Sequence, residues 1–569
     1  MYLAVTLWSA WAVGLAVLGM SAGPLPAQEN AAEKCVFAGT ARNSVTRAGV
    51  GKVSIRLVPL SGAMGYAGWS DAVGAFRFSG LVAGDYRVEA VRTGYTAKWV
   101  LADPSGHTIS RLHLAPGQPV AGSDLWLSPE SGIAGKVMGP DSEPLRGAQI
   151  TLIAREWRSG KRVYVGLQTA FTDAEGVYHC AAVSPGRYLL YAARPTRGPL
   201  AFSVLEEPGK PEMRIAGRYH PNSPQLEGAA LIELHPGEEI LGIDFRLPLV
   251  PVFHVTGKPP SENASVRLAK RSNDQALEWE EERASTGKDG SFDISGIAPG
   301  NYFLYSVEAS SNSNRFDLLR SARIPLTVTA QDTAGLVAPP LAQFALQGRI
   351  RVEDGDIAEA IPVQIFFDGS EADEYTSFQR RAEPKADRTF AIPNLTPDRY
   401  EIRIVNRETG KEGGYYLKAV RVNGVKAAGG EIDMTGGAAP DVELILSAGV
   451  GSAEGTVKWP DEGSKAASVD PAVELTVVLI PESVPSGDNR PVTAYLDQDG
   501  RFRVTDLEPG SYRALATTNY DKDLWRNAEF LRLLARRGTP LEVTEKGTAR
   551  VEAPLLPAGE VRQAEEQIQ

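Results

Sequence analysis

The sequence predicts an all-β protein of five tandem seven-stranded antiparallel sandwiches, with one short helix in the last of them. Three observations lead to this prediction. One strand–turn–strand signature recurs five times along the 569 residues. Glycine and proline are frequent, at 57 and 39 residues, which suits a fold with many turns. Only two cysteines occur, so the sandwiches must rely on buried cores rather than on a disulfide framework.

The recurring signature places an aromatic residue ten positions before a tyrosine. A turn, often Asp-Gly or Glu-Gly, precedes the aromatic residue, and its glycine supplies a positive φ. Alternating apolar residues then indicate a half-buried strand. The five aromatic–tyrosine pairs are Phe76 and Tyr86, Tyr178 and Tyr188, Phe292 and Tyr302, Phe390 and Tyr400, and Phe502 and Tyr512.

A second turn leads into each tyrosine, with an apolar residue three positions before the glycine and, in all copies except Leu81-Val-Ala-Gly84, a proline. We expect its glycine to take a left-handed conformation while proline fixes φ. These glycines are Gly84, Gly186, Gly300 and Gly510, and the fourth copy carries Asp398 instead. The tyrosine opens the next strand, where it can bury its ring and hydrogen-bond its hydroxyl to a nearby backbone group.

A second motif, a glycine followed by a short strand, opens each unit. It stands at Gly39, Gly135, Gly257, Gly348 and Gly455. The motifs divide the chain into sandwiches at 30–129, 130–250, 251–344, 345–447 and 448–557, followed by a disordered tail at 558–569. Because one closing strand nearly abuts the next opening strand, we expect a semi-rigid rod or arc. Apolar spacing predicts the helix near 523–537.

The first residues predict export. An apolar run from Leu3 to Met20 is followed by small residues and a polar junction, which indicates a signal peptide, 1–27, cut near Ala27. The run lacks a preceding Lys or Arg and is long enough to be a retained membrane anchor, so both interpretations stay open. No later segment is a membrane-span candidate. The protein is therefore expected in the periplasm, on the outer surface or outside the cell.

These motifs resemble the carboxypeptidase regulatory-like domain family of transthyretin-like, immunoglobulin-like sandwiches, which is related to the B-type repeats of collagen adhesins and to carbohydrate-binding, starch-binding-like folds. The matching pieces are the Gly-x-Val opening with Pro144-Leu-Arg-Gly-Ala, and the Asp499-Gly-x-Phe core that ends at Tyr512. The likeness covers most of 35–557 and points to bacterial exported multi-repeat proteins. It implies a stabilising, adhesive or carbohydrate-contacting role and no peptidase activity.

Catalytic and cofactor motifs are absent from the sequence. The six histidines show no His-x-x-Glu or His-Glu-x-x-His spacing, so we predict no zinc site, and neither cysteine is placed for nucleophilic catalysis. His179 and Cys180 are consecutive on a predicted strand and should face opposite ways. The net charge of −11 argues against nucleic acid as a partner. We therefore predict no enzymatic activity, no cofactor and no metal.

Three functions remain open. The first is an envelope or extracellular scaffold or adhesion protein whose partners are envelope components. The second is a polysaccharide-binding protein, for which exposed tryptophans would serve as stacking platforms. Candidate platforms are Trp69, Trp99, Trp157, Trp279 and Trp459. The third is an accessory part of a carboxypeptidase-like system, which rests on the family resemblance alone.

Overall fold

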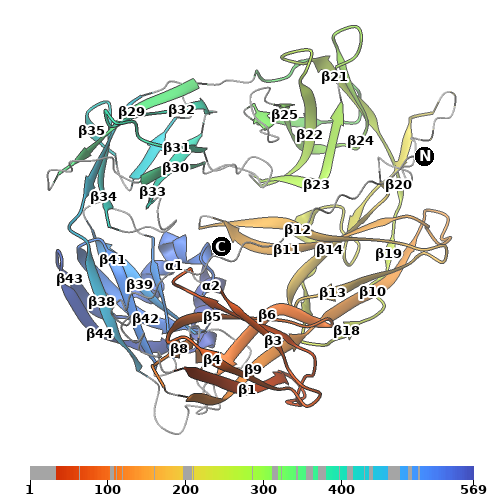
Figure 1. Cartoon of the computed structure of the whole chain (residues 1–569). Helices are drawn as coiled ribbons and strands as arrows, with labels where there is room; N and C mark the ends of the chain where they lie inside the picture. The colour runs from red at the N-terminus through yellow and green to blue at the C-terminus, as the bar shows by residue number, and fades with distance from the viewer. Residues whose placement is uncertain are drawn as a thin grey trace, which may run out of the picture.

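The computed structural model describes residues 34–568, except 63, 103–107, 110–111, 118, 159, 196–204, 206–207, 209, 274, 285, 310–317, 322, 341–343, 354–362, 370–379, 396–397, 407–413, 428–429, 435–439, 459–474, 485–489, 498–499 and 519. The chain is all-β, and its strands fall into five two-layer sandwiches, here called modules 1 to 5 in chain order (Figure 1). The proposed signal peptide, 1–27, lies outside the described residues.

Module 1 pairs a sheet of order β4-β1-β9-β6-β7 with a sheet of order β3-β2-β5-β8. Its strands are β1 (Cys35–Asn43), β2 (Ser54–Pro59), β3 (Tyr66–Trp69), β4 (Ala75–Leu81), β5 (Gly84–Val91), β6 (Tyr95–Ala102), β7 (Thr108–Ile109), β8 (Leu112–Leu114) and β9 (Pro119–Pro129).

In module 2, strands β11 and β12 form a long hairpin. β11 also pairs with β14, the strand that contains the repeated tyrosine of this module. Its strands are β10 (Ser131–Met138), β11 (Gln149–Arg158), β12 (Lys161–Phe171), β13 (Val177–Val183), β14 (Gly186–Ala193), β15 (Met213–Ile215), β16 (Arg218–Tyr219), β17 (Ile232–Leu234), β18 (Glu239–Ile240), β19 (Phe245–Arg246) and β20 (Leu249–Pro251).

Modules 3 and 4 repeat the two-layer plan. Module 3 comprises β21 (Phe253–Lys258), β22 (Ser265–Ser272), β23 (Gln275–Ala284), β24 (Phe292–Ile297), β25 (Gly300–Ala309), β26 (Leu318–Arg320), β27 (Ile324–Val328) and β28 (Thr333–Val337). Module 4 comprises β29 (Phe344–Val352), β30 (Val363–Gly369), β31 (Arg380–Ala382), β32 (Thr389–Leu395), β33 (Arg399–Asn406), β34 (Tyr416–Val422), β35 (Val425–Lys426), β36 (Glu431–Asp433) and β37 (Asp441–Ser447).

Module 5 joins its two layers into one seven-stranded sheet, because β44 pairs with both β38 and β42. Its strands are β38 (Gly451–Lys458), β39 (Thr476–Ser483), β40 (Val492–Tyr495), β41 (Arg501–Leu507), β42 (Gly510–Thr517), β43 (Thr539–Val543) and β44 (Thr548–Leu556). Its helices are a 3-10 turn (Leu524–Arg526), α1 (Ala528–Ala535) and α2 (Ala558–Gln567).

The sheets are antiparallel apart from the closing strands. In every module the first strand pairs in parallel with a closing strand, as β1 does with β9 and β29 with β37. The closing strand reaches its place after the chain has crossed between the two layers, so it runs in the direction of the opening strand. Each sandwich is thus a mixed fold with one core of its own.

The two sequence motifs meet in space. The opening glycine of each module is the register partner of the first aromatic residue, in the pairs Gly39 and Phe76, Gly135 and Tyr178, Gly257 and Phe292, Gly348 and Phe390, and Gly455 and Phe502. A Cβ at Gly348 would lie 2.3 Å from the Phe390 ring and 2.7 Å from a carbonyl oxygen of β37. Glycine is therefore required because the ring lies over its backbone and the parallel strand closes in beside it.

The last unit differs from two sequence predictions. The helix begins at Ala528 rather than near 523, because the side chain of Asn527 accepts hydrogen bonds from the N–H groups of Glu529 and Phe530 and caps the helix there. Residues 558–567 form α2 instead of the expected disordered tail. Val561, Ala564 and Ile568 share a face, and that face is buried against module 5.

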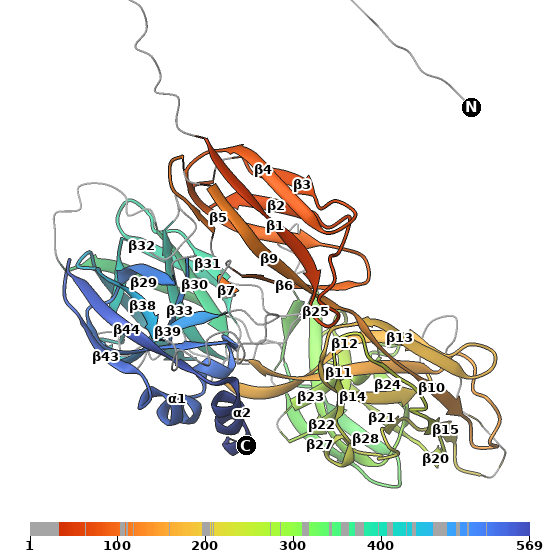
Figure 2. The same cartoon turned by 90° about the horizontal axis from the view of Figure 1, so that it is seen from below.

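The modules do not form the expected rod or arc. Figures 1 and 2 show them arranged as a circuit in which the β11–β12 hairpin of module 2 reaches α1 and α2 of module 5. Module 2 also contacts module 3 through a shared apolar cluster, and Glu401 of module 4 pairs with Arg490 of module 5 at 3.0 Å. The prediction failed because the tip of the β11–β12 hairpin, at Trp157, packs against a module that is distant in sequence.

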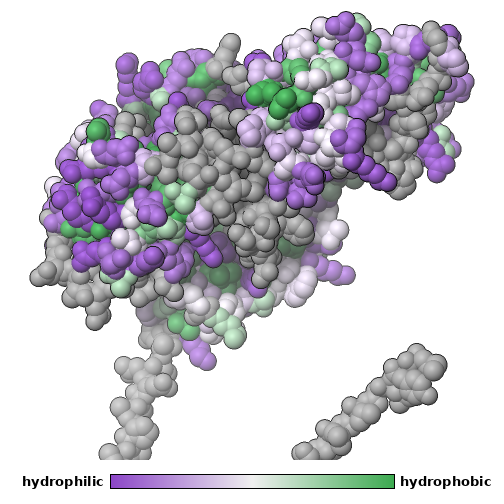
Figure 3. Space-filling model, turned by 90° about the horizontal axis from the view of Figure 1, so that it is seen from above, coloured by the Kyte–Doolittle hydropathy of each residue, from purple (hydrophilic) through white to green (hydrophobic). Residues whose placement is uncertain are grey.

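Hydrophilic residues predominate among the coloured residues on the face seen in Figure 3. On the face seen in Figure 3, hydrophobic surface is broken into separate patches among polar side chains. Within the described part of the chain, no helix is both long and apolar enough to cross a membrane.

Candidate functional site

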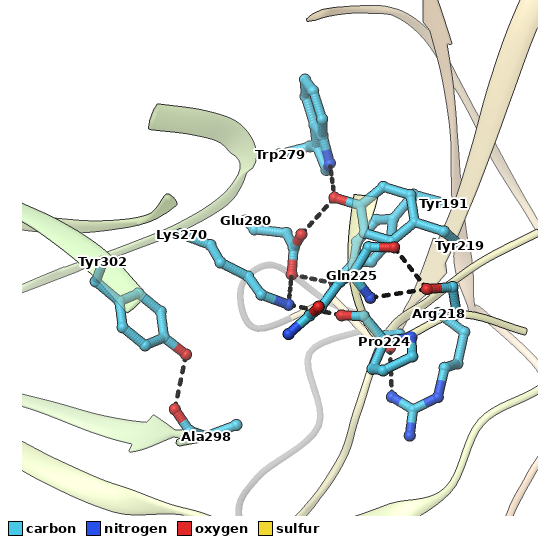
Figure 4. Close-up of polar contacts among 12 residues, drawn as sticks. Tyr191, Arg218, Tyr219, Pro224, Gln225, Lys270, Trp279, Glu280, Ala298 and Tyr302 are labelled. Carbon is cyan, nitrogen blue, oxygen red and sulfur yellow. Dashed lines mark hydrogen bonds and ion pairs between the residues drawn. The ribbon is translucent and has the colours of Figure 1, made fainter. Parts of the chain in front are cut away.

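An irregularity in β23 creates the most elaborate polar site among the described residues. The register with β22 jumps between the pairs Ala269–Glu281 and Lys270–Leu277. Three residues of β23, 278–280, therefore have no partner in β22, and the strand bulges. The bulge directs Trp279 and Glu280 toward module 2, where they meet β14 and β16 (Figure 4).

Glu280 is the centre of this site. Its carboxylate accepts hydrogen bonds from the hydroxyls of Tyr219 and Tyr191, the latter at 3.1 Å, and pairs with the Lys270 ammonium at 3.1 Å (Figure 4). The indole Nε1 of Trp279 donates to the Tyr219 hydroxyl at 2.9 Å. Three donors thus compensate a carboxylate that is only 10% exposed.

The two tyrosines act as fixed donors. Burial, together with the Glu280 charge, raises the pKa of both Tyr191 and Tyr219 well above the ordinary value, so both hydroxyls keep their protons. Gly217 makes room for one of them, since a Cβ there would lie 2.0 Å from the Tyr191 hydroxyl oxygen. The backbone of module 2 is therefore shaped to admit this hydrogen bond.

Further contacts fasten module 3 to module 2. The Gln275 amide accepts from the N–H of Tyr164 at 2.8 Å and donates to its carbonyl at 2.6 Å, which covers the free edge of β12 as a neighbouring strand would. Arg214 pairs with Glu282 at 2.9 Å and donates to the carbonyl of Gly296 at 2.9 Å. Because the contacts come from several strands, they fix the orientation of the two modules.

A cavity of about 760 Å³ lies in the cleft between modules 2 and 3, beside this network. Its lining includes Trp279 and Tyr191 together with cationic, acidic and amide side chains of both modules. A volume of this size accommodates a small ligand. The polar lining suits recognition through hydrogen bonds and charge, and we call it the 2–3 cleft.

The repeated tyrosines share one hydrogen bond. The hydroxyls of Tyr86, Tyr188, Tyr302 and Tyr512 each donate, at 2.7 Å, to the carbonyl oxygen four residues earlier. The ring of Tyr400 is also buried, but the residue four positions before it lies outside the described part of the chain. The tyrosines thereby tie the turn to the core of each module.

The glycines before these tyrosines fall into two groups. Gly84 and Gly510 have positive φ, of 146° and 150°, in the range that favours glycine, whereas Gly186 and Gly300 are not among the positive-φ residues, so the expected conformation is absent there. They open the tyrosine strand, and at Gly186 a Cβ would lie 3.1 Å from the Tyr188 hydroxyl. There, contact with the folded-back tyrosine favours glycine.

The predicted tryptophan platforms separate into different environments. Trp69 is 70% exposed on β3. Trp157 is 6% exposed and packs against module 5, so its prediction as a platform is wrong. Trp279 lines the 2–3 cleft with its Nε1 already bonded. The side chain of Trp99, and all of Trp459, lie outside what the structure describes.

Cys35, Cys180 and His179 form no nucleophilic pair in the described part of the chain. Cys35 and Cys180 are buried free thiols, and burial raises the pKa of Cys180 to about 11. His179 faces the opposite way, where it contacts Glu239 at 3.2 Å. Within the described residues, no group of three or more His, Cys, Asp or Glu could hold a metal ion.

Sequence reasoning missed the 2–3 cleft. Glu278 to Glu282 form an acidic run around Trp279, which is unusual for a strand with alternating burial. That departure from alternation was the available signal, because it marks the bulge that carries Trp279 and Glu280 to module 2.

Comparisons with known proteins identify no family for this chain and find only distantly similar structures. No family model matches the chain, and no curated protein matches it. Among solved structures, a streptococcal ancillary pilin is 12% identical, with 54% of this chain and all of that chain covered, at a TM-score of 0.17. The minor pilin GBS52 of Streptococcus agalactiae is 11% identical, covering 38% of this chain and 97% of that chain, with a TM-score of 0.21. The major pilin subunit BcpA of Bacillus cereus is 11% identical, covering 54% of this chain and all of that chain, with a TM-score of 0.14. Likeness at this level carries no argument about function, and the fold rests on the sheets described above.

Proposed function

We propose that this chain is a non-catalytic, exported scaffold or adhesion protein of the cell envelope or extracellular space. The observation that carries the proposal is the fixed placement of its modules. Module 2 is held to module 3 by a buried polar network and to module 5 by an apolar contact. Such a frame holds the surfaces of separate modules at constant distances, which a spacing or adhesive protein requires.

The use of the repeated residues supports the same proposal. Each opening glycine accommodates an aromatic ring or closing strand, and four of the tyrosines bond to their own turns. The repeated glycines, aromatic residues and tyrosines therefore serve the folding of each module. Partners would then bind at the loops and at the junctions between modules. Export is supported by the apolar segment Leu3–Met20.

Two measurements test the proposal. A C-terminally tagged full chain is expected in the envelope or culture fluid after cell fractionation, and its retention in the cytoplasm would contradict export. Small-angle X-ray scattering of residues 28–569 should give the profile of a compact particle with a single, well-defined maximum dimension. A profile typical of freely jointed modules would contradict the fixed frame.

Polysaccharide binding is the second candidate, and Trp69 favours it. Its ring is exposed on the outer face of the sheet β3-β2-β5-β8, where Ser54 lies between Trp69 and Val91 in register. Arg56 and Glu89, 3.6 Å apart, supply hydrogen-bonding groups on that sheet. A glycan array should show binding that Trp69→Ala abolishes. Equal binding by the variant would remove Trp69 from this role.

A further inference from the structure

The 2–3 cleft contains a cation without an acidic partner. Arg218 lies in β16, lines the cleft and is half-buried. Its guanidinium donates to the carbonyl of Gly217 at 2.8 Å, and among the described residues no carboxylate lies within ion-pair distance of it. Burial lowers its pKa from the ordinary value, because the charged form loses water without gaining a counter-ion.

The acids of the cleft are already committed to other groups. Glu280 pairs with Lys270, Glu281 with Arg267 and Glu282 with Arg214. Glu227 accepts from the hydroxyl of Ser272 at 2.5 Å. In a chain of net charge −11, a half-buried guanidinium left over in a cleft is an unusual arrangement. It would be compensated by an anion that enters from outside.

The rest of the lining indicates what carries that anion. Amides of Gln149, Gln225 and Asn273, and the hydroxyl of Thr151, surround the cavity together with the indole of Trp279. Neutral donors and acceptors beside an aromatic ring suit a polyhydroxylated ring compound better than a bare ion. The cavity of about 760 Å³ is also much larger than one carboxylate needs.

A peptide is a poorer occupant of the cleft. Extended peptides bind most simply by adding to an open strand edge. At the same module junction the edge of β12 is covered, because Gln275 bonds both the N–H and the carbonyl of Tyr164. The lining of the cavity itself is rich in charged and amide side chains, which favours recognition through side chains.

We propose that the 2–3 cleft is a binding site for an acidic saccharide, with Arg218 pairing with a sugar carboxylate and Trp279 contacting a sugar ring. The site goes beyond the scaffold proposal and does not depend on it, since a scaffold can lack this site and a binding protein can have it.

Isothermal titration calorimetry of residues 28–569 at low salt tests the site. Trigalacturonate is expected to bind, while neutral galactotriose should bind at least 10-fold more weakly. Arg218→Gln should weaken trigalacturonate binding at least 10-fold, and Arg218→Lys, which keeps the charge, should weaken it less. The matched control is Arg187→Gln, an exposed arginine of β14 outside the cleft, which should leave affinity unchanged.

Three results would overturn the proposal. The first is equal binding of the acidic and neutral sugars, and the second is unchanged affinity in Arg218→Gln. The third is absence of trigalacturonate binding by the wild-type protein when its circular dichroism shows that it is folded. Tighter binding of a poly-glutamate peptide than of trigalacturonate would also overturn it, because the cleft would then serve a protein partner. Scattering on the same samples reports the module arrangement separately, so failure of the site is distinguishable from failure of the scaffold.

Discussion

The β11–β12 hairpin makes two contacts that differ in chemistry. Along its length it meets module 3 through polar groups, where Gln275 bonds the backbone of Tyr164 and Trp279 packs beside Gly166. At its tip it meets module 5 through Trp157, which is 6% exposed among apolar residues of the helical layer. Both contacts combine apolar and polar groups. Hydrogen bonds to the strand edge distinguish the contact with module 3, whereas a buried tryptophan ring, whose indole also donates to Glu565, distinguishes the contact with module 5.

The two contacts therefore contribute differently to the orientation of the modules and to the free energy that holds them together. Directional hydrogen bonds fix how module 3 sits on module 2, but each adds little net stability because water offers the same bonds to the separated modules. Burial of the Trp157 ring removes apolar area from water and needs no exact angle. Around it, Gly160 donates to the carbonyl of Asp523 at 2.9 Å, and Asn527 donates to that of Gly160 at 3.0 Å.

The largest expected effect is at the apolar contact. Trp157→Ala should lower the free energy of opening the module 2–5 contact by about 4 kcal/mol, because a large buried ring is lost. Native-state hydrogen exchange at the amides of Gly160 and α2 measures it. Trp69→Ala, at a 70% exposed tryptophan, is the matched control and should change stability by less than about 0.5 kcal/mol. Similar effects at both positions would mean that the tip is not an anchor.

The core of a single module should respond nearly as strongly. Tyr302→Ala should destabilise module 3 by about 3 kcal/mol, since a buried ring and its bond to Ala298 are both removed. Tyr302→Phe removes only the hydroxyl and should cost about 1 kcal/mol. Urea unfolding monitored by hydrogen exchange in β25 distinguishes the two. A neutral Tyr302→Ala would show that the tyrosine does not anchor its turn.

The polar contact should be weaker than the apolar one. Glu280→Ala should cost about 2 kcal/mol, because Lys270 and the two tyrosine hydroxyls lose their shared acceptor in a mostly buried site. Exchange of the β23 amides reports this loss, and exposed Glu233→Ala serves as the control. If Glu280→Ala cost more than Trp157→Ala, the proposed division between the two contacts would be reversed.

The smallest effect is a pH dependence of the module 2–3 contact. His254 of module 3 bonds Asp293 at 2.8 Å and Glu212 of module 2 at 3.3 Å, and these carboxylates raise its pKa above 6.5. Its contribution is therefore complete below pH 6.5 and is lost as the pH rises through the raised pKa. Because Asp293 is 54% exposed, we expect less than about 1 kcal/mol.

Stability measured from pH 6 to 8.5 in wild type and His254→Gln isolates this term. The wild-type advantage should shrink as the pH rises. His220, whose pKa burial lowers, contributes with the opposite sign but is common to both proteins. A constant difference across the range would exclude His254 as a charged bridge.

The fold was largely predictable because its signal is local. The turn, the alternating strand and the tyrosine lie within a few residues of one another and recur five times. The pairing of Gly39 with Phe76 was not predictable in the same way, although both motifs were recognised. It joins β1 to β4, which are separated in sequence by two strands of the other sheet. The parallel closing strands are hidden for the same reason.

The candidate site was harder to predict because it depends on which modules touch. Trp157 and Trp279 look alike in sequence as aromatic residues outside the repeated positions, yet one is buried against module 5 and the other lines the 2–3 cleft. Nothing local marks Tyr219 as the partner of Glu280, 61 residues later. Helix α2 was detectable from the spacing of Val561, Ala564 and Ile568.

The contact of Trp157 with Glu565 spans 408 residues, and this has a consequence for the order of folding. A chain made from its N-terminus completes module 2 long before residues 524–567 exist. Until then the indole at the hairpin tip has no partner and faces water. The contact of the hairpin tip with module 5 therefore forms only after modules 3, 4 and 5 have been synthesised. The final helix completes this contact when it is made, so loss of residues 558–567 would remove the hydrogen-bond partner of the Trp157 indole and leave the closing strand β44 in place.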